Sequence, residues 1–414
     1  MKTYHTHTLN NGLRIIHEHC DSEVVYCGYV ICAGTRHEEA HDYGMAHFIE
    51  HMSFKGTERR KAVHITNGLE RVGGDLNAFT NKQETVYYAT ILRPDFPRAV
   101  DLLTDIVFHS TYPQHEIDKE VEVICDEIDS YKDSPSEIIF DEFEALLYNN
   151  HELGRDILGD PQRLRSYTTA DALRFTQKYY RPENAVFYVY GNLDFNKVVK
   201  ILEKAQTDKA ETTATPIIPT PQALQLPQPL TGVHTRTKET HQAHVLTGAL
   251  TFGGKDDRRF GLLLLNNMLG GPGMNSRLNM SLRERAGLVY SVDAYLNTYP
   301  DIGHWNIYFG CDPKDVNRCL KLINKELKRF VNQPLSASQL AAAKKQLRGQ
   351  IGISCDAFES YSLALGKTFA HYNSYRDVEN LYQALEEVTA EELQQIAAEI
   401  YHPERITTLI YSPE

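Results

Sequence analysis

Hydrophobic and polar residues follow two different periods along this chain. Short runs rich in β-branched and aromatic residues, such as 13–17, 24–32 and 76–92, predict strands. Longer segments with apolar residues three and four positions apart, such as 98–109 and 116–131, predict amphipathic helices. Because strands and helices are mixed, the pattern predicts an α+β fold, in which a mainly antiparallel sheet has helices packed on one face.

The end of each half of the chain carries the same predicted unit. Residues 169–190 begin with a threonine-capped helix that has an acidic first turn, and continue with a proline-containing turn and an apolar strand. Residues 389–411 repeat this order at similar spacing. The repetition of a whole helix–turn–strand unit predicts that the two halves are homologous domains.

A low-complexity stretch separates the two halves. Residues 206–232 contain several prolines and no hydrophobic periodicity, a composition typical of an extended linker. The sequence therefore predicts a first domain over 1–205, a linker over 206–232 and a second domain over 233–414. Each domain has the size expected of a unit with its own hydrophobic core.

Composition narrows the classes of function. The 414 residues include 43 basic and 55 acidic side chains, which give a formal net charge of −12 at pH 7. An acidic protein repels nucleic acid, so we expect no nucleic-acid partner. No apolar run approaches the roughly 18 residues that cross a membrane, and no secretory signal is visible, which favours a cytoplasmic protein without a membrane partner. Seven cysteines without C-x-x-C spacing indicate free thiols.

The strongest chemical signal is a polar trio within the apolar segment 45–54. His47, Glu50 and His51 stand there at H-x-x-E-H spacing. On a helix, residues three and four apart share one face, so both imidazoles can reach one metal ion. Two imidazoles and one carboxylate form a ligand set that suits zinc. A further carboxylate that is not a ligand can take a proton from the zinc-bound water.

Two other interpretations of this segment compete with a metal site. Polar residues on an exposed helix face fit poorly, because unpaired histidine and glutamate among apolar neighbours cost free energy. A pair of core histidines hydrogen-bonded to Glu50 remains an alternative. The H-x-x-E-H order is also the signature of the inverzincin peptidases, which favours the catalytic interpretation.

A third protein ligand has to come from another part of the chain. The predicted helix over 116–131 carries a run of acidic residues. Glu120 and Glu127 are about two helical turns apart, so they lie on the same helix face. Spacing alone does not choose between them. Most acids in such a run are expected on a solvated face.

Further segments extend the pattern beyond the H-x-x-E-H helix. In the first half they are 44–57 (GMAHFIEHMSFKGT), 73–80 (GGDLNAFT) and 85–88 (TVYY). In the second half they are 276–278 (SRL) and 282–291 (LRERAGLVYS). Together they resemble the pitrilysin/insulysin superfamily of zinc peptidases, most closely the branch that contains mitochondrial processing peptidase and its bacterial relatives. The resemblance covers essentially the whole chain.

The resemblance implies a specific set of metal ligands. It predicts one zinc ion per chain, bound by His47, His51 and Glu127, with Glu50 as the general base. It places Glu120 outside the ligand set, where its carboxylate would orient a ligand histidine.

The resemblance also implies that the second half supplies catalytic groups, Arg283 and Tyr290. A guanidinium and a tyrosine hydroxyl can stabilise the oxyanion that develops when a peptide bond is attacked. Without the resemblance, a surface charge and a core aromatic residue would be the preferred interpretation of these two positions.

Substrate-binding residues follow from the same resemblance. Asn77 and Ala78 match edge-strand positions that hold an extended peptide by its backbone. Phe54 matches an apolar pocket residue beside the bond that is cut. Glu137 and Asp141 match acidic positions that recognise a basic residue before the cut, although two acids on an amphipathic helix explain this spacing equally well.

These expectations describe a zinc-dependent endopeptidase that hydrolyses unfolded peptides. The resemblance implies that two chains close around a chamber, and a chain of this length predicts a homodimer. A non-catalytic structural or chaperone-like subunit of the same family is the alternative, and a metal-binding protein without hydrolytic activity is another. The complete set of ligands, base and Arg/Tyr pair favours the enzyme.

Overall fold

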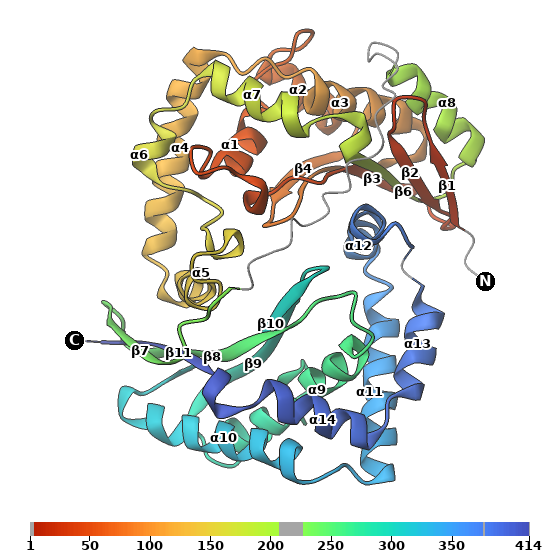
Figure 1. Cartoon of the computed structure of the whole chain (residues 1–414). Helices are drawn as coiled ribbons and strands as arrows, with labels where there is room; N and C mark the ends of the chain where they lie inside the picture. Colours follow the sequence, from red (N-terminus) through yellow and green to blue (C-terminus); the bar gives the residue numbers. More distant parts are fainter. Residues whose placement is uncertain (1–3, 207–226, 376, 414) are drawn as a thin grey trace. The chain divides into compact units, whose positions relative to one another are not determined.

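The computed structural model describes residues 4–206, 227–375 and 377–413, which form two compact units (Figure 1). Unit 1 lies within Met1–Ser130, Arg155–Gln222 and Cys355–Arg376, and unit 2 within Tyr131–Gly154, Ala223–Ser354 and Asp377–Glu414. Residues 207–226 of the predicted linker over 206–232 lie outside the described residues. None of the helices in the described segments has the length and apolarity needed to span a membrane.

Unit 1 is built on a sheet with the strand order β1-β2-β6-β3-β5-β4. Neighbouring strands are antiparallel except for β2 and β6. The strands are β1 (Tyr4–Thr8), β2 (Arg14–Glu18), β3 (Val24–Ile31), β4 (Asp75–Thr80), β5 (Thr85–Leu92) and β6 (Ala185–Tyr190). The helices are α1 (Met45–Met52), α2 (Ala62–Glu70), α3 (Phe96–Phe108), α4 (Gln114–Lys132, except its last residues), α6 (Pro161–Leu164), α7 (Thr169–Tyr179), α8 (Phe195–Ala205) and α12 (Phe358–Tyr372).

Unit 2 is built on a sheet with the strand order β7-β11-β8-β10-β9, in which only β7 and β11 are parallel. The strands are β7 (Gly232–Thr237), β8 (Ala243–Phe252), β9 (Val289–Thr298), β10 (Ile302–Cys311) and β11 (Thr407–Ser412). The helices are α5 (Pro135–Leu147), α9 (Arg259–Gly270), α10 (Val316–Asn332), α11 (Ala337–Ser354), α13 (Val378–Glu387) and α14 (Ala390–Ile400), with a π-helical turn, η5 (Asn279–Glu284).

The two sheets have the same topology. When β1 is left out, each sheet arranges its strands, numbered along the chain, in the order first, fifth, second, fourth, third. Each also places its parallel pair at the same end. The predicted α+β class with mainly antiparallel sheets is confirmed, and the shared topology supports the predicted homology of the halves. The predicted threonine cap is Thr389 for α14, but it is Thr168, one residue earlier than predicted, for α7.

A helix from the second half of the chain belongs to unit 1. Leu365 and Phe369 of α12 pack against Val30 and Val186, which lie on one face of the first sheet. Tyr29, the neighbour of Val30 on β3, points to the opposite face and joins the core formed with α1 and α3. Helices therefore cover both faces of this sheet, and α12 covers the face away from α1.

Conversely, a helix from the first half of the chain, α5, belongs to unit 2. Phe143 and Leu147 of α5 pack against Leu246 of β8 and Leu409 of β11. The compact units therefore differ from a simple division into 1–205 and 233–414, because segments 131–154 and 355–375 each belong to the unit built on the other half's sheet. An apolar helix face requires a partner surface, but it does not specify which sheet provides that surface.

A buried ion pair ties α12 to the first sheet. Glu84, just before β5, is 6% exposed, and its Oε2 accepts a hydrogen bond from Nε2 of His371 at 2.8 Å. Its Oε1 accepts another from Asn81 at 2.9 Å and lies 3.7 Å from Nζ of Lys367. Burial alone would raise the pKa of Glu84, but the hydrogen bond and charge of His371, followed by Lys367, lower that pKa to about 2.

We expect this carboxylate to stabilise the protein only above mildly acidic pH. Because the folded pKa of about 2 lies below the ordinary value of 4.5, its contribution is complete above pH 4.5 and is lost as pH falls through 2. The free energy of unfolding of the wild type minus that of Glu84→Gln should therefore be larger by about 3 kcal/mol at pH 6 than at pH 2. Urea unfolding followed by circular dichroism measures this difference. A pH-independent difference would contradict the ion pair.

Candidate metal centre

The H-x-x-E-H motif lies on α1, whose start is fixed by specific contacts. Gly44 precedes the helix at a φ of 85°, where a side chain would be strained and a Cβ would lie 2.7 Å from Gly159. The backbone N–H groups of Gly44 and Ala46 donate to the buried carboxylate of Glu38 at 3.0 and 2.9 Å. These bonds satisfy donors that the first turn of a helix leaves unpaired. The helix is therefore held in place by its own neighbours.

Two imidazoles of α1 meet one carboxylate of α4. The rings of His47 and His51 are 4.6 Å apart between centroids. Oε1 of Glu127 lies 4.0 Å from Nε2 of His47, and its Oε2 lies 3.5 Å from Nε2 of His51. One ligand atom from each residue can be chosen so that all lie within 4.8 Å of one another. Among the described residues, no other group of histidine, cysteine and carboxylate side chains meets this condition.

These side chains fit a zinc ion. Ligands bound tetrahedrally at about 2.1 Å lie about 3.4 Å apart, so small side-chain rotations close the observed separations around one ion. Burial, and then the neighbouring His51, lower the pKa of His47 to about 4, which leaves its imidazole neutral with a free lone pair at pH 7. For His51 burial acts in the same direction, but Glu120 and Glu127 outweigh it and raise the pKa. A cation can replace the proton that these carboxylates hold on His51.

Glu120 contacts the outer nitrogen of His51. Its Oε1 accepts a hydrogen bond from Nδ1 of His51 at 3.0 Å, and its Oε2 lies 2.5 Å from Nζ of Lys55. Glu120 is buried. Glu127 instead faces the inner nitrogens, Nε2, of both histidines. The geometry therefore favours Glu127 as the ligand and Glu120 as the residue that orients His51, a choice that spacing alone left open.

Glu50 has a separate partner. Its Oε2 accepts a hydrogen bond from Oγ1 of Thr80, at the end of β4, at 2.6 Å. Burial raises the pKa of Glu50, and the bond from Thr80 partly opposes that rise. The histidines face Glu120 and Glu127 instead, which argues against a core histidine pair hydrogen-bonded to Glu50.

Three residues that position the centre, Glu38, Lys55 and Thr80, are not predicted from the sequence. Lys55 and Thr80 stand in the conspicuous segments 44–57 and 73–80, which was the one signal available. Their contacts depend on how α1 packs against α4 and β4, and no local pattern encodes that packing.

The residues predicted to bind substrate in unit 1 lie on neighbouring elements. Asn77 and Ala78 belong to β4, which is the last strand of its sheet and has β5 as its neighbour. Phe54 follows α1, is partly buried and packs against the core, with its ring 6.3 Å from that of Tyr87. The edge strand contacts the metal centre directly, because Thr80 of β4 donates its hydrogen bond to Glu50.

The remaining predicted residues belong to unit 2. Tyr290 of β9 is 87% exposed, and the guanidinium of Arg283 lies 5.8 Å from the centre of its ring. Glu137 and Asp141 lie on α5, where Asp141 accepts a hydrogen bond from the hydroxyl of Tyr131 at 2.6 Å. The predicted roles of these four residues in catalysis and specificity stay predictions.

Comparison with known proteins identifies the family. Residues 14–161 match the family model "Insulinase (Peptidase family M16)", and residues 166–347 match "Peptidase M16 inactive domain". The chain is 32% identical to a Bacillus subtilis protein named as the uncharacterized zinc protease YmxG, over 98% of this chain and 97% of that protein. The chain belongs to peptidase family M16. This confirms the resemblance inferred from the motifs.

Other M16 relatives carry related names. The chain is 30% identical to the mitochondrial-processing peptidase subunit beta of Bos taurus, over 94% of this chain and 80% of that protein. A relative from Mycobacterium leprae, 32% identical, is also named a zinc protease. Zinc is therefore a feature of the family. His47, His51 and Glu127 all fall in the region that matches the first M16 model.

Solved structures of other proteins share the fold. A protease from Helicobacter pylori superposes with a TM-score of 0.91 at 21% identity, over the whole length of both chains. A structure described as a peptidase M16 inactive domain, from Pseudomonas fluorescens, gives 0.87 at 19% identity, covering 99% of this chain and 98% of that one.

Proposed function

We propose that this M16 protein is a zinc-dependent endopeptidase that hydrolyses unfolded peptides. One observation carries the proposal: His47, His51 and Glu127 present ligand atoms within 4.8 Å of one another, and Glu50, which is not part of that set, stands on the same helix. A site that only stored metal would not need a half-buried carboxylate with a raised pKa beside its ligands.

Each side chain of the centre would have a different role in peptide hydrolysis. A zinc ion in this centre would supply Lewis acidity, which polarises the peptide carbonyl and makes water easier to deprotonate. Because Thr80 donates to Oε2 of Glu50, Oε1 is left to take the proton of the attacking water. The same carboxyl group then gives the proton to the leaving amine. Glu120 fixes the ring of His51 through Nδ1, so that Nε2 stays directed at the ion.

The substrate would bind as an added strand. The outer edge of β4 offers backbone groups at Asn77 and Ala78 to an extended peptide, and backbone hydrogen bonds tolerate many sequences. Phe54 would receive an apolar side chain near the cut. We further propose that Arg283 and Tyr290 donate hydrogen bonds to the developing oxyanion.

We propose a cytoplasmic homodimer as the working form, with each chain binding one zinc ion and two copies enclosing the substrate. A chamber of this kind admits unfolded peptides and excludes folded proteins. Glu137 and Asp141 would favour a basic residue near the cut, since their carboxylates are four residues apart on α5. Mass spectrometry of a peptide-library digest tests this preference, and random cleavage with respect to lysine and arginine would exclude it.

Removal of the metal tests the enzyme proposal directly. We expect the purified chain to cleave an internally quenched fluorogenic peptide, to lose this activity after dialysis against 1,10-phenanthroline, and to regain it with one equivalent of zinc. Sedimentation velocity on the same sample measures whether two copies associate. If the zinc-loaded chain binds peptide but never cleaves it, the non-catalytic, chaperone-like alternative is correct.

A further inference from the structure

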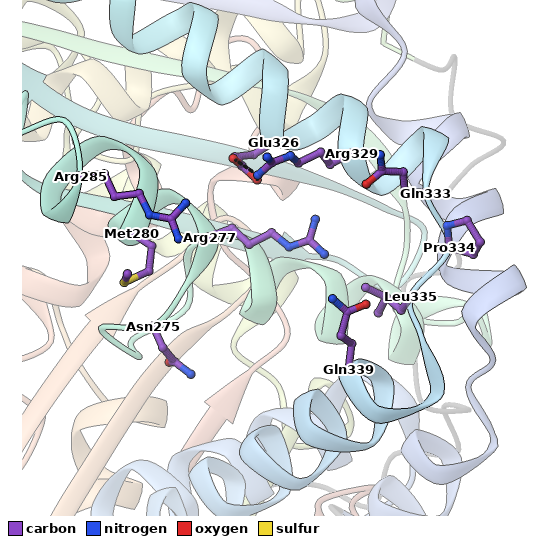
Figure 2. A pocket seen from close by; sticks show the side chains of 10 residues that line it. All are labelled: Asn275, Arg277, Met280, Arg285, Glu326, Arg329, Gln333, Pro334, Leu335 and Gln339. Carbon is purple, nitrogen blue, oxygen red and sulfur yellow. Dashed lines mark hydrogen bonds and ion pairs between the residues drawn. The ribbon is translucent and has the colours of Figure 1, made fainter.

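Unit 2 contains a hollow that the proposed peptidase chemistry does not use. It has a volume of about 370 Å³ and lies between the loop after α9, the turn η5, and α10 with the start of α11 (Figure 2). Its charged side chains are Arg277, Arg285, Arg329 and Glu326. Three guanidinium groups against one carboxylate give the hollow a positive charge, although the whole chain carries a net charge of −12.

Arg277 is held in place without an ion pair, although the charge of Glu326 also acts on its guanidinium. Its guanidinium stacks on the ring of Phe330, with 3.7 Å between the guanidinium carbon and the ring centroid. Within the described residues, its side chain makes no hydrogen bond or ion pair. Burial lowers the pKa of Arg277, although an arginine stays charged at neutral pH. Its N–H donors are not sealed from solvent, so they are open to an anion that enters the hollow.

The single carboxylate of the hollow is already engaged. Glu326 is 4% exposed, and both of its oxygens accept hydrogen bonds from Nη1 of Arg329, at 2.8 and 3.1 Å. Arg285 is exposed and, like Arg277, has no acceptor for its guanidinium among the described residues. Two cations of the hollow are therefore unpaired, and they lie on the same short segment, 277–285, that leads through η5.

A second basic hollow adjoins the first. It has a volume of about 620 Å³, shares Arg329 and Gln333 with the first, and is otherwise marked by Lys321, Lys325 and Lys328 of α10. The lysines follow one another at helical spacing along α10, so their ammonium groups extend the positive field beyond the arginines.

We propose that these adjoining hollows bind a small phosphate-bearing anion, with Arg277 and Arg285 as its guanidinium contacts. A guanidinium presents two parallel N–H donors that match two phosphate oxygens, and its rigid fork loses little entropy on binding. The lysines of α10 would contact a second phosphate as point charges. A monocarboxylate carries one charge and fewer acceptors, so it is the weaker ligand for two unpaired guanidiniums.

Calorimetric titration of the zinc-loaded full chain tests the proposal with inorganic phosphate, pyrophosphate and acetate at constant ionic strength. We expect pyrophosphate to bind more tightly than phosphate, and phosphate more tightly than acetate. The double variant Arg277→Gln/Arg285→Gln should weaken phosphate binding by about tenfold or more, because it removes charge-assisted hydrogen bonds. Arg318→Gln, an exposed arginine of α10 outside both hollows, is the matched control and should leave the affinity unchanged.

Three results would overturn the site: absence of phosphate binding, equal affinity in the wild type and the double variant, or acetate binding as tightly as phosphate. Pyrophosphate also binds zinc, but all variants share the same zinc centre, so differences between them report on the hollow. If Arg277→Gln does not fold, the exposed Arg285→Gln carries the test alone, and an unchanged phosphate affinity in that variant rejects the proposal. These measurements do not depend on peptide hydrolysis.

Discussion

Replacing Glu50 by glutamine should lower kcat/KM for peptide hydrolysis by roughly a hundred- to ten-thousandfold, while the zinc content stays at one ion per chain. Glutamine has the shape of glutamate and still accepts the hydrogen bond of Thr80, so α1 keeps its geometry. The amide has no basic lone pair, however, and cannot take the proton of the attacking water. The metal ligands are untouched, because His47, His51 and Glu127 form the cluster without Glu50.

The measurement pairs steady-state kinetics on a fluorogenic peptide with zinc analysis of the same sample. Glu70→Gln is the matched control, because Glu70 is an exposed glutamate at the end of α2 and lies outside the cluster. It should leave both kcat/KM and zinc content unchanged. Unchanged hydrolysis by Glu50→Gln would remove the general base from the mechanism. Loss of zinc in that variant would instead show that Glu50 is a ligand.

The sheets were predictable because their strands carry local signals. The run of β-branched and aromatic residues in segment 24–32 predicts β3, which spans Val24–Ile31 in the structure. The duplication was visible in the repeated helix–turn–strand unit, and both copies end in the predicted strands, β6 and β11. The strands and the repeated unit depend on residues that are close together in the sequence, so one amino-acid sequence is enough to predict them.

The exchange of α5 and α12 was not predictable from such signals. Phe143 of α5 and Phe369 of α12 mark apolar faces that require burial, but either sheet offers a suitable surface. The choice depends on the summed packing of distant segments and on chain connectivity. The stacking of Arg277 on Phe330 was not predictable for the same reason, because the two residues are far apart in the sequence and no helix or strand periodicity connects them.

At the metal centre, the local spacing predicts the two histidine ligands but leaves the distant carboxylate ligand open. His47 and His51 are neighbours by helical geometry alone. Glu120 and Glu127 share one face of α4 but are separated by about 10 Å along its axis, so only one of them can reach a given ion. Which one does so depends on the register of α4 against α1, a tertiary quantity that helical spacing does not contain.

Glutamine variants of these two glutamates should separate a metal ligand from a residue that orients one. We expect Glu127→Gln to weaken zinc binding by about 150-fold, since a binding free energy of about 10–16 kcal/mol shared among three or four ligands gives roughly 3 kcal/mol for each. Glu120→Gln should weaken it by about ten- to a hundredfold, because glutamine still accepts the hydrogen bond from Nδ1 of His51 but loses the negative charge. Competition with a fluorescent zinc chelator measures both affinities.

Glu122→Gln provides the control on the same helix. Glu122 is exposed and pairs with Arg165 at 2.9 Å, so its substitution should not change zinc affinity. If Glu120→Gln lost more affinity than Glu127→Gln, the assignment of ligand and orienting residue would be reversed. If all three variants bound zinc equally well, the carboxylates of α4 would be a solvated acidic run, and the centre would lack its third protein ligand. The expected order of affinity loss, Glu127 before Glu120 before Glu122, follows from which imidazole nitrogens each carboxylate faces. Glu127 faces Nε2 of both histidines, Glu120 contacts only Nδ1 of His51, and Glu122 pairs with Arg165 instead.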